Sequence, residues 1–485
     1  MTKELRRLSI LMLIMFLALF GSTSWIQVVH AETLSADPHN ERALLDSYEV
    51  QRGAIVASGT AIATSVPSGD RYSWQRTYVD APMWGHVTGW INPILQSATG
   101  IERAMNQELS GTAGSQFLAR IDRILTGQPP RGSNVTLSLD AAVQRAAFEA
   151  LGSLQGAVVA IEPATGRILA MVSSPSFDTN QLAAHDTAAV NEYYDTLEDA
   201  SDDPLSNRAI GGDLNPPGST FKLVVASAAL ASGQWTPDST LPNPASYQLP
   251  QSSNVVFNAW RGTCGDGETV TIAEALRLSC NIPFAELAVE LGDTAIREEA
   301  EKYGFNSSFA TPLESTPSSY PRALDDPQTA LTGFGQGQVT ATPLQMAMVS
   351  AGIGNGGVVM NPHMVDEVIG PDLTVQQKFE NTEFGRALDE DLAEQMVQMM
   401  VAGVSSGAAT GARIDGVDVA GKTGTAENGT GQPFTLWFTG FAPAVDPRVA
   451  VAVVVEDGGG QGQSGTGNTI AAPIAKKVME AVLGR

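Results

Sequence analysis

A serine and a lysine three residues apart form the first pattern in this sequence that can carry covalent chemistry. Ser219 and Lys222 follow two prolines and a glycine, so a helix is expected to begin near Ser219 and to place both side chains on one face. A serine hydroxyl is a weak nucleophile and needs a base within hydrogen-bond reach. Lys222 can be that base only if burial or a second cation lowers its pKa from about 10.4.

A second pair of polar residues, Ser279 and Asn281, forms an S-x-N turn directly after a helix-like run at residues 272–278. Such a turn can direct a hydroxyl and an amide into one cleft. The pattern is common by itself, so it carries weight only beside other residues that can do chemistry.

The third pattern is K-T-G-T, which runs from Lys422 to Thr425 and follows a strand-like segment at residues 417–420. Lys422 supplies a cation, and Gly424 permits close approach of a ligand to the backbone. The hydroxyls of Thr423 and Thr425 can bind a carboxylate. The pattern therefore predicts one wall of an anion-binding cleft.

Lys422 also completes a different pattern, G-x-x-x-x-G-K-T, which begins at Gly416 and is typical of phosphate-binding loops. That loop needs a strand that ends near the first glycine and a helix that opens at the lysine. Here the strand-like alternation lies between the two glycines and continues into Lys422, and residues 423–426 are a poor helix start. We therefore interpret this match as accidental.

Together, S-x-x-K, S-x-N and K-T-G occur in the order that is the signature of penicillin-binding proteins and serine β-lactamases. The sequence resembles a class B penicillin-binding protein, most of all the short penicillin-binding protein A type. The resemblance covers essentially the whole chain after its N-terminal apolar segment. Further segments that carry it are residues 40–42, 52–55, 100–102, 335–337, 342–345 and 437–441.

The resemblance implies a peptidoglycan D,D-transpeptidase, which cross-links stem peptides through a serine acyl-enzyme and releases D-alanine. Ser219 would attack the penultimate D-alanine carbonyl, and Lys222 would take the serine proton. Ser279 would relay a proton to the leaving amine, Asn281 would hold the substrate amide, and Lys422 would contribute positive potential. β-Lactams would acylate the same serine.

By the same resemblance, Thr423 and Thr425 would bind the terminal carboxylate of the substrate, beside Gly424. The backbone N–H groups of Ser219 and Thr425 would form the oxyanion hole. Neither a metal nor an organic cofactor is implied. The implied partners are the lipid-linked peptidoglycan precursor, a separate glycan polymerase and other proteins of the cell-wall complex that serves growth, cell shape or division.

Three alternatives share parts of this pattern: a D,D-carboxypeptidase with water as the acceptor, a serine β-lactamase, and a non-catalytic scaffold of the cell-wall complex. A class A β-lactamase would carry an E-x-x-L-N run, which the sequence lacks. It would also lack the extra domain that we expect before residue 128. The intact Ser219, Lys222 and Lys422 argue against the scaffold.

Strand-like runs near both ends of the chain, with helical patterns between them, predict an α+β fold. The expected transpeptidase domain, of the penicillin-binding and serine β-lactamase type, is an antiparallel sheet flanked by helices at residues 135–485. A smaller N-terminal pedestal or dimerisation domain is expected at residues 32–134, after a membrane segment at residues 1–31. Residues 186–203 are interpreted as an exposed, acidic excursion.

The composition describes a globular chain, because 43% of its 485 residues are hydrophobic and only 16% are charged. The formal net charge is −24. Because a polyphosphate would be repelled by this charge, the composition excludes non-specific binding of nucleic acid.

The N-terminus indicates contact with a membrane, because Lys3, Arg6 and Arg7 precede a mostly apolar run at residues 8–29. A run of about 20 residues can span a bilayer, and the basic flank would keep the N-terminus in the cytoplasm. The alternative is a signal peptide that is cleaved at residues 29–31. Both interpretations place the remaining chain outside the cytoplasm, and the first predicts a single-pass membrane protein.

Cys264 and Cys280 are the only cysteines of the chain. Outside the cytoplasm they can oxidise, and a disulfide closing a loop of about 15 residues would contribute about 3 kcal/mol. Two free buried thiols are the alternative. Because no histidine lies near them in the sequence, the two cysteines are too few for a zinc site.

Overall fold

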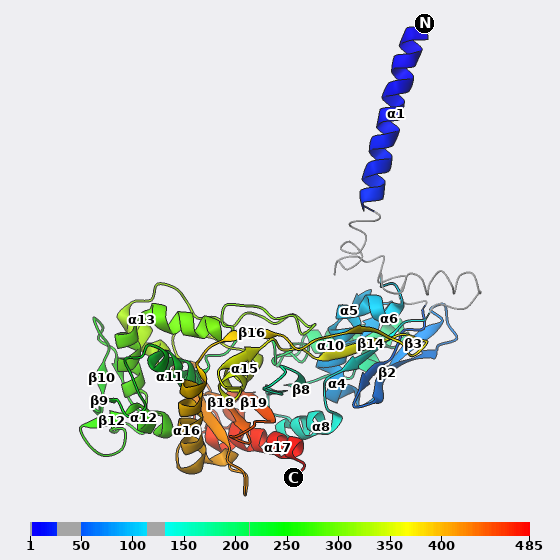
Figure 1. Cartoon of the computed structure of the whole chain (residues 1–485). Coiled ribbons are helices and arrows are strands. Elements are labelled where there is room, and N and C mark those ends of the chain that lie inside the picture. Colours follow the sequence, from blue (N-terminus) through cyan, green and yellow to red (C-terminus); the bar gives the residue numbers. More distant parts are fainter. Residues whose placement is uncertain (1, 27–49, 114–130, 213) are drawn as a thin grey trace.

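The computed structural model of the chain describes residues 2–26, 50–113, 131–212 and 214–485 (Figure 1). The possible cleavage site at residues 29–31 and the segment at residues 40–42 lie outside this part. Helix α1 (Thr2–Ser24) precedes two bodies, each built on its own β-sheet. By length and composition, residues Lys3–Ser24 are sufficient to cross a membrane.

The larger body is built on a five-stranded antiparallel sheet. Its strands are, in spatial order, β17 (Ala420–Ala426), β18 (Thr435–Ala442), β19 (Val449–Val455), β7 (Gly156–Ile161) and β8 (Ile168–Ser174). The three central strands are buried along their whole length, which requires cover on both faces of the sheet. Helix α15 (Pro343–Gly354) covers one face, and helices α8 (Ala141–Leu151) and α17 (Ala472–Leu483) cover the other.

Alternate residues of β19 reveal the two apolar layers. Val451 and Val453 belong to the same core cluster as Val478 of α17. Ala452 lies between them in the sequence, yet it belongs to the cluster that contains Met346 of α15. Successive strand residues point to opposite faces, so a run of small and β-branched residues can fill both layers.

A group of helices adjoins the β17 side of this sheet (Figure 1). It comprises η3 (Gly218–Phe221), α11 (Lys222–Ala231), α12 (Ile272–Leu278), α13 (Ile282–Lys302), α14 (Asp326–Thr332) and α16 (Glu390–Ser406). Short helical turns elsewhere are η4 (Thr410–Ala412), η5 (Asp457–Gly460) and the π-helix η6 (Gly467–Ala471). Two-stranded pairs are β9 (Thr240–Pro242) with β12 (Thr269–Thr271), β10 (Tyr247–Gln248) with β11 (Val255–Val256), and β13 (Val358–Met360) with β16 (Glu383–Arg386).

The smaller body, the pedestal, is built on a six-stranded sheet. Its strands are, in spatial order, β15 (Val375–Lys378), β14 (Val365–Ile369), β6 (Asn134–Leu137), β1 (Ile55–Ala57), β2 (Thr60–Pro67) and β3 (Trp74–Tyr78). β1 and β6 are parallel, and the other neighbours are antiparallel. The elements packed around it are α4 (Ala81–Thr88), β4 (Ile91–Asn92), β5 (Ser97–Ala98), α5 (Gly100–Ala104), α6 (Asn106–Ser110), α9 (Thr179–Leu182) and α10 (Thr187–Glu198).

The six-stranded sheet takes strands from both sides of the expected boundary between residues 134 and 135. Strand β6 spans that boundary, and β14 returns from far along the chain to pair with it. An uncovered β6 would present unpaired N–H and C=O groups, and the β14–β15 hairpin removes that edge. Residues 365–378 therefore belong to the pedestal sheet, although they lie inside the range expected for the transpeptidase domain.

The acidic segment at residues 186–203 also differs from the expectation, because most of it forms helix α10. The Asp186 side chain starts the helix by accepting hydrogen bonds from the N–H groups of Ala188 and Ala189. Its buried residues are Val190 and Leu197. So small an apolar face produces little periodicity in the sequence, which explains why the helix was not predicted.

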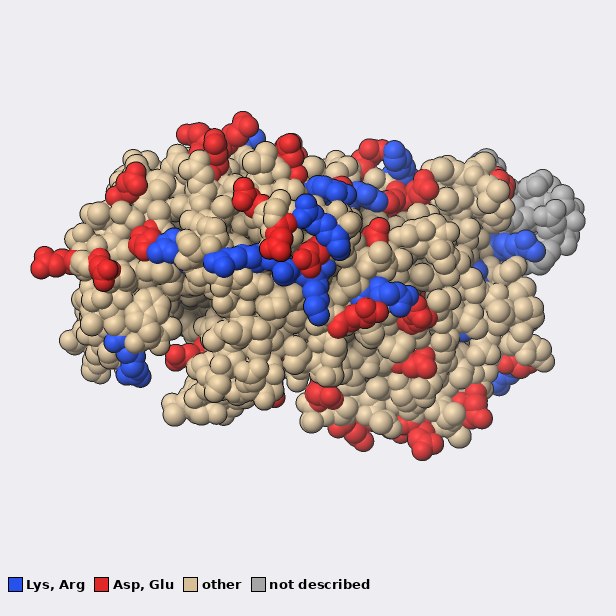
Figure 2. Space-filling view, turned by 90° about the horizontal axis from the view of Figure 1, so that it is seen from below, with Lys and Arg blue, Asp and Glu red and all other residues tan. Residues whose placement is uncertain are grey.

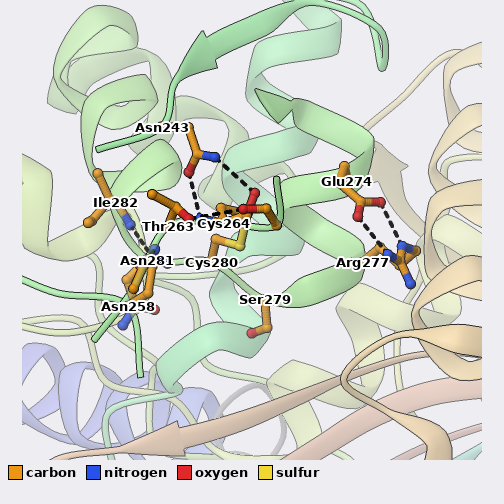
Figure 3. The surroundings of a disulfide bond; sticks show 12 residues. Asn243, Asn258, Thr263, Cys264, Glu274, Arg277, Ser279, Cys280, Asn281 and Ile282 are labelled. Atoms are coloured by element: carbon orange, nitrogen blue, oxygen red, sulfur yellow. Dashed lines mark hydrogen bonds and ion pairs between the residues drawn. A yellow bond between two sulfur atoms is a disulfide. The ribbon is translucent and has the colours of Figure 1, made fainter. Parts of the chain in front are cut away.

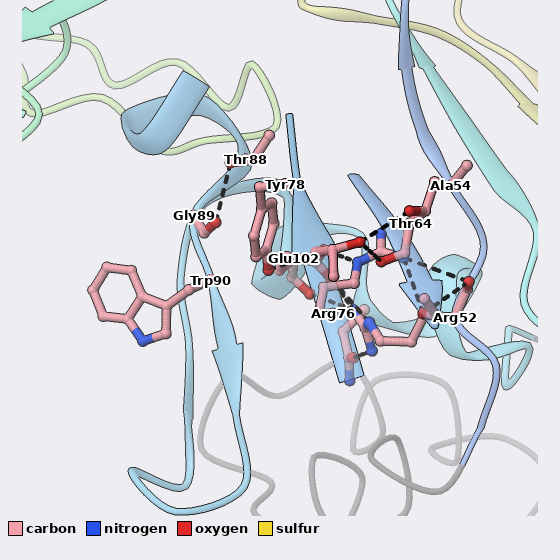
Figure 4. Close-up of polar contacts among 12 residues, drawn as sticks. Arg52, Ala54, Thr64, Arg76, Tyr78, Thr88, Gly89, Trp90 and Glu102 are labelled. Carbon is pink, nitrogen blue, oxygen red and sulfur yellow. Dashed lines mark hydrogen bonds and ion pairs between the residues drawn. The ribbon is translucent and has the colours of Figure 1, made fainter. Parts of the chain in front are cut away.

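A buried cluster of charges holds the pedestal together (Figure 4). Both carboxylate oxygens of Glu102 are bound, with Arg52 Nη2 2.8 Å from Oε2 and Arg76 Nε 2.5 Å from Oε1. Arg52 also donates to the Asn106 side chain at 2.6 Å. Burial alone would raise the pKa of Glu102, but the charges of Arg76 and Arg52 outweigh burial and lower it. The cluster thus joins the segment before β1, strand β3 and helix α5.

We predict that Glu102→Ala destabilises the pedestal by about 3–5 kcal/mol, because it leaves two guanidinium groups buried without their carboxylate. Urea unfolding of the full chain, followed by tryptophan fluorescence, measures this loss. Arg145→Ala is the control, since it breaks an ion pair with Asp80 whose side chains are 53% and 46% exposed. The idea fails if the two variants unfold at the same urea concentration.

Candidate active site

The serine turn, residues 216–221, presents Ser219 at the start of a buried helix. Residues Gly218–Phe221 form a 3-10 turn, and the α-helix begins at Lys222 rather than at Ser219 as the sequence suggested. The two side chains still meet, because Lys222 Nζ lies 2.9 Å from Ser219 Oγ. Ser219 is partly exposed, whereas Lys222 is fully buried at 0% exposure. The turn therefore offers its hydroxyl to a cleft and keeps its amine in the interior.

The Lys222 amine is placed to act as a base. In addition to its contact with Ser219 Oγ, Nζ has two other partners. It donates to Ser279 O at 2.8 Å and to Asn281 Oδ1 at 2.9 Å. Burial, and then the charge of Lys422, hold the pKa of Lys222 well below the ordinary lysine value. A neutral amine has two hydrogens, and two carbonyl oxygens that can only accept occupy both of them. The remaining lone pair then faces the hydroxyl of Ser219.

The S-x-N turn connects two helices. Ser279 ends α12 in the left-handed region with φ 65°, a conformation that is costly for a residue other than glycine. Asn281 immediately precedes α13 and orients its amide by donating Nδ2–H to the Phe257 carbonyl at 3.1 Å. This contact leaves Asn281 Oδ1 to face Lys222. The strained turn is thus held in a position where the Ser279 carbonyl and the Asn281 side-chain oxygen both contact Lys222 Nζ.

The K-T-G segment lies on β17, the edge strand of the five-stranded sheet. Lys422 Nζ donates to Ser279 Oγ at 2.6 Å, and burial lowers the pKa of Lys422 to about 7. A Cβ on Gly424 would lie 2.8 Å from Pro217 O, so only glycine lets the strand pass this close to the serine turn. Because β17 continues as a strand through Lys422, the phosphate-loop interpretation of Gly416 and its neighbours is excluded.

The two threonines of this segment differ in their surroundings. Thr423 is 7% exposed, and its hydroxyl donates to the Ala408 carbonyl at 3.0 Å. Thr425 is partly exposed, and its Oγ1 accepts from the N–H of Gly467 at 3.3 Å. The contact with Gly467 thus leaves the hydroxyl hydrogen of Thr425 unused, whereas the hydroxyl hydrogen of Thr423 is bound to the Ala408 carbonyl.

The structure brings five of the predicted site residues into one hydrogen-bonded chain, with Ser219, Lys222, Ser279, Asn281 and Lys422 linked by direct contacts. Gly424 and Thr425 lie beside the serine turn on the same strand.

Two residues that support the serine turn were not assigned this role from the sequence. Trp437 Nε1 donates to Pro216 O at 2.9 Å, and the Gly218 N–H donates to Gly335 O at 3.0 Å. Trp437 lies 221 residues from Pro216 along the chain. No local pattern can reveal such a partner, although both residues lie in segments that carry the family resemblance.

Cys280, between Ser279 and Asn281, is joined to Cys264 in a disulfide (Figure 3). Asn243 accepts a hydrogen bond from the Cys264 N–H at 2.6 Å and donates to the Cys264 carbonyl at 3.1 Å. The S-x-N turn is therefore attached to a second loop that is itself fixed.

We predict that a thiol titration of the denatured, unreduced protein finds no free thiol, and that reduction releases two. The bond closes a loop with a sequence separation of 16 residues. Cys264→Ala/Cys280→Ala should therefore lose about 3 kcal/mol of stability in urea unfolding. Two reactive thiols before reduction would contradict the bond.

Two stretches of the chain match known families. Residues 156–480 match the penicillin-binding protein transpeptidase domain, and residues 52–135 match the penicillin-binding protein A dimerisation domain.

Whole-chain relatives agree with these matches. The chain is 39% identical to the peptidoglycan D,D-transpeptidase PbpA of Mycolicibacterium smegmatis, with 100% of this chain and 99% of that protein covered. PbpA of Mycobacterium tuberculosis has the same identity and coverage. The structure of penicillin-binding protein A from M. tuberculosis, a ceftriaxone acyl-enzyme complex, aligns with a TM-score of 0.87 at 39% identity. That alignment covers 90% of this chain and 100% of the other. The chain therefore belongs to the penicillin-binding protein transpeptidase family.

Proposed function

We propose that this protein is a peptidoglycan D,D-transpeptidase, which joins two stem peptides through an acyl-enzyme on Ser219 and releases D-alanine. The observation that carries the proposal is the buried amine of Lys222, 2.9 Å from Ser219 Oγ and bound on its other sides to carbonyl oxygens. An amine in this setting can remove the serine proton. Relatives that match along the whole chain are peptidoglycan D,D-transpeptidases, which supports the choice of substrate.

In the acylation step, Ser219 Oγ attacks the carbonyl of the penultimate D-alanine while its proton passes to Lys222. The N–H groups of Ser219 and Thr425 stabilise the oxyanion. Ser279 Oγ accepts from Lys422, so it passes its own hydrogen to the leaving amine and takes a proton from Lys422 in its place. D-Alanine then departs with that proton, and the acyl group remains on Ser219.

In the second step, the amine of a neighbouring stem peptide attacks the acyl-enzyme and loses a proton through Ser279 to Lys422, while Lys222 returns its proton to Ser219 Oγ. Asn281 lines the cleft beside Lys222 and holds the substrate amide. Lys422 and Thr425 bind the terminal carboxylate of the donor peptide, with the hydroxyl of Thr425 as the donor. The hydroxyl of Thr423, which was also expected to bind this carboxylate, donates its hydrogen to the Ala408 carbonyl instead.

Helix α1 serves as a single membrane anchor in this proposal, with the basic residues Lys3, Arg6 and Arg7 on the cytoplasmic side. The transpeptidase domain then lies outside the cytoplasm, where the cell wall is built. In this proposal, glycan strands come from a separate polymerase acting on the lipid-linked precursor.

We predict that labelled penicillin forms a stable covalent adduct on Ser219 and that Ser219→Ala abolishes it. Peptide mass spectrometry of the inhibited protein locates the label. Ser232→Ala, at the far end of the same helix, is the matched control and should acylate like the wild type. A folded protein that forms no adduct would support the scaffold alternative, and rapid hydrolysis of the adduct would support a β-lactamase.

A donor peptide that ends in D-alanyl-D-alanine distinguishes transpeptidase from carboxypeptidase activity. When an amine acceptor is added, a transpeptidase transfers the acyl group to that amine. If water alone releases the acyl group under these conditions, the protein is a carboxypeptidase.

A further inference from the structure

Helix α13 begins directly after Asn281, yet the side chain of Asn281 does not cap it. The first N–H groups of a helix lack intrahelical partners, and asparagine is one of the residues that most often accept from them. Here both ends of the Asn281 amide are directed elsewhere. Its oxygen accepts from Lys222 at 2.9 Å, and its nitrogen donates to the carbonyl of Phe257 at 3.1 Å.

The missing cap comes from a different loop. The side-chain oxygen of Asn258 accepts from the N–H of Asn281 at 2.8 Å and from the N–H of Ile282 at 3.1 Å (Figure 3). Its side-chain nitrogen donates to the Gly262 carbonyl at 2.8 Å. Asn258 is only 1% exposed, so water cannot easily replace these contacts. Two adjacent residues therefore hold Asn281: Asn258 binds its backbone N–H, and Phe257 binds its side chain.

The loop that carries Asn258 is itself anchored on both sides. Before it, Val256 of β11 packs in one apolar cluster with Ile282 and Ala285 of α13. After it, Cys264 is bonded to Cys280. The side chain of Asn258 is consequently fixed relative to α13 without any help from a substrate.

We propose that Asn258 is a positioning residue for acylation. By capping α13 from outside, it fixes the backbone of Asn281 and leaves the Asn281 amide free to hold Lys222. Without Asn258, the buried N–H groups of Asn281 and Ile282 lose their partner, and the turn shifts to recover one. The Lys222 amine then loses one of the two acceptors that direct its lone pair at Ser219. This inference rests on the proposed function.

The test compares the rate at which labelled penicillin acylates the full-length wild type, Asn258→Ala and Asp140→Ala. Asp140 is a matched control, because it caps α8 by accepting from two backbone N–H groups at 2.8 and 3.1 Å, far along the chain from the site. We expect both variants to lower the melting temperature, and only Asn258→Ala to slow acylation, by about tenfold or more. Equal acylation rates for Asn258→Ala and the wild type would overturn the assignment.

A double-variant cycle then separates positioning from general damage to the fold. If Asn258 acts through Asn281, adding Asn258→Ala to Asn281→Ala slows acylation no further. If the full loss persists in that background, Asn258 acts by another route and the inference is wrong. Asn258→Ser keeps one acceptor oxygen on a shorter side chain and gives the same comparison if the alanine variant does not fold. A wild type without an adduct on Ser219 would instead overturn the proposed function.

Discussion

The arrangement of the candidate active site depends on the burial of the Lys222 amine. Lys222 is fully enclosed, and an ammonium ion at its position would be desolvated and would face the charge of Lys422. Burial therefore favours the neutral form, and two carbonyl oxygens fix the direction of its lone pair. Neither condition is sufficient alone, because a buried amine without fixed acceptors would not aim at Ser219. An exposed lysine held by the same acceptors would keep its proton.

Three segments that are distant in the sequence must meet for this arrangement to exist. The serine turn, the S-x-N turn and strand β17 each carry part of it, and the five-stranded sheet with its three covering helices keeps them in register. Gly424 lets β17 pass against the serine turn. The disulfide at Cys280 and the contacts around Asn281 hold the third segment. Rigidity in these supports maintains distances of less than 3 Å around Lys222.

Local patterns singled out five residues that the structure brings into contact, because the serine, the lysine and the K-T-G strand each have fixed neighbours in the sequence. Strand-like runs near both ends of the chain also predicted an antiparallel sheet, which the five-stranded sheet confirms. What could not be predicted depends on long-range partners, such as the return of β14 to the pedestal sheet or the cap that Asn258 gives to α13. Thr423 is a further case, since only the position of Ala408 shows where its hydroxyl points.

Burial and the charge of Lys422 hold the pKa of Lys222 well below the ordinary lysine value, and nuclear magnetic resonance of carbon-13-labelled lysine in the unliganded protein measures this shift directly. We expect the Lys222 signal, assigned by its loss in Lys222→Met, to titrate well below the ordinary midpoint of about 10.4. Because Lys422 also lowers the pKa of Lys222, Lys422→Gln should move that midpoint upward. A Lys222 signal that titrates near 10, together with the exposed lysines, would show that Lys222 is an ordinary ammonium group and not a buried base.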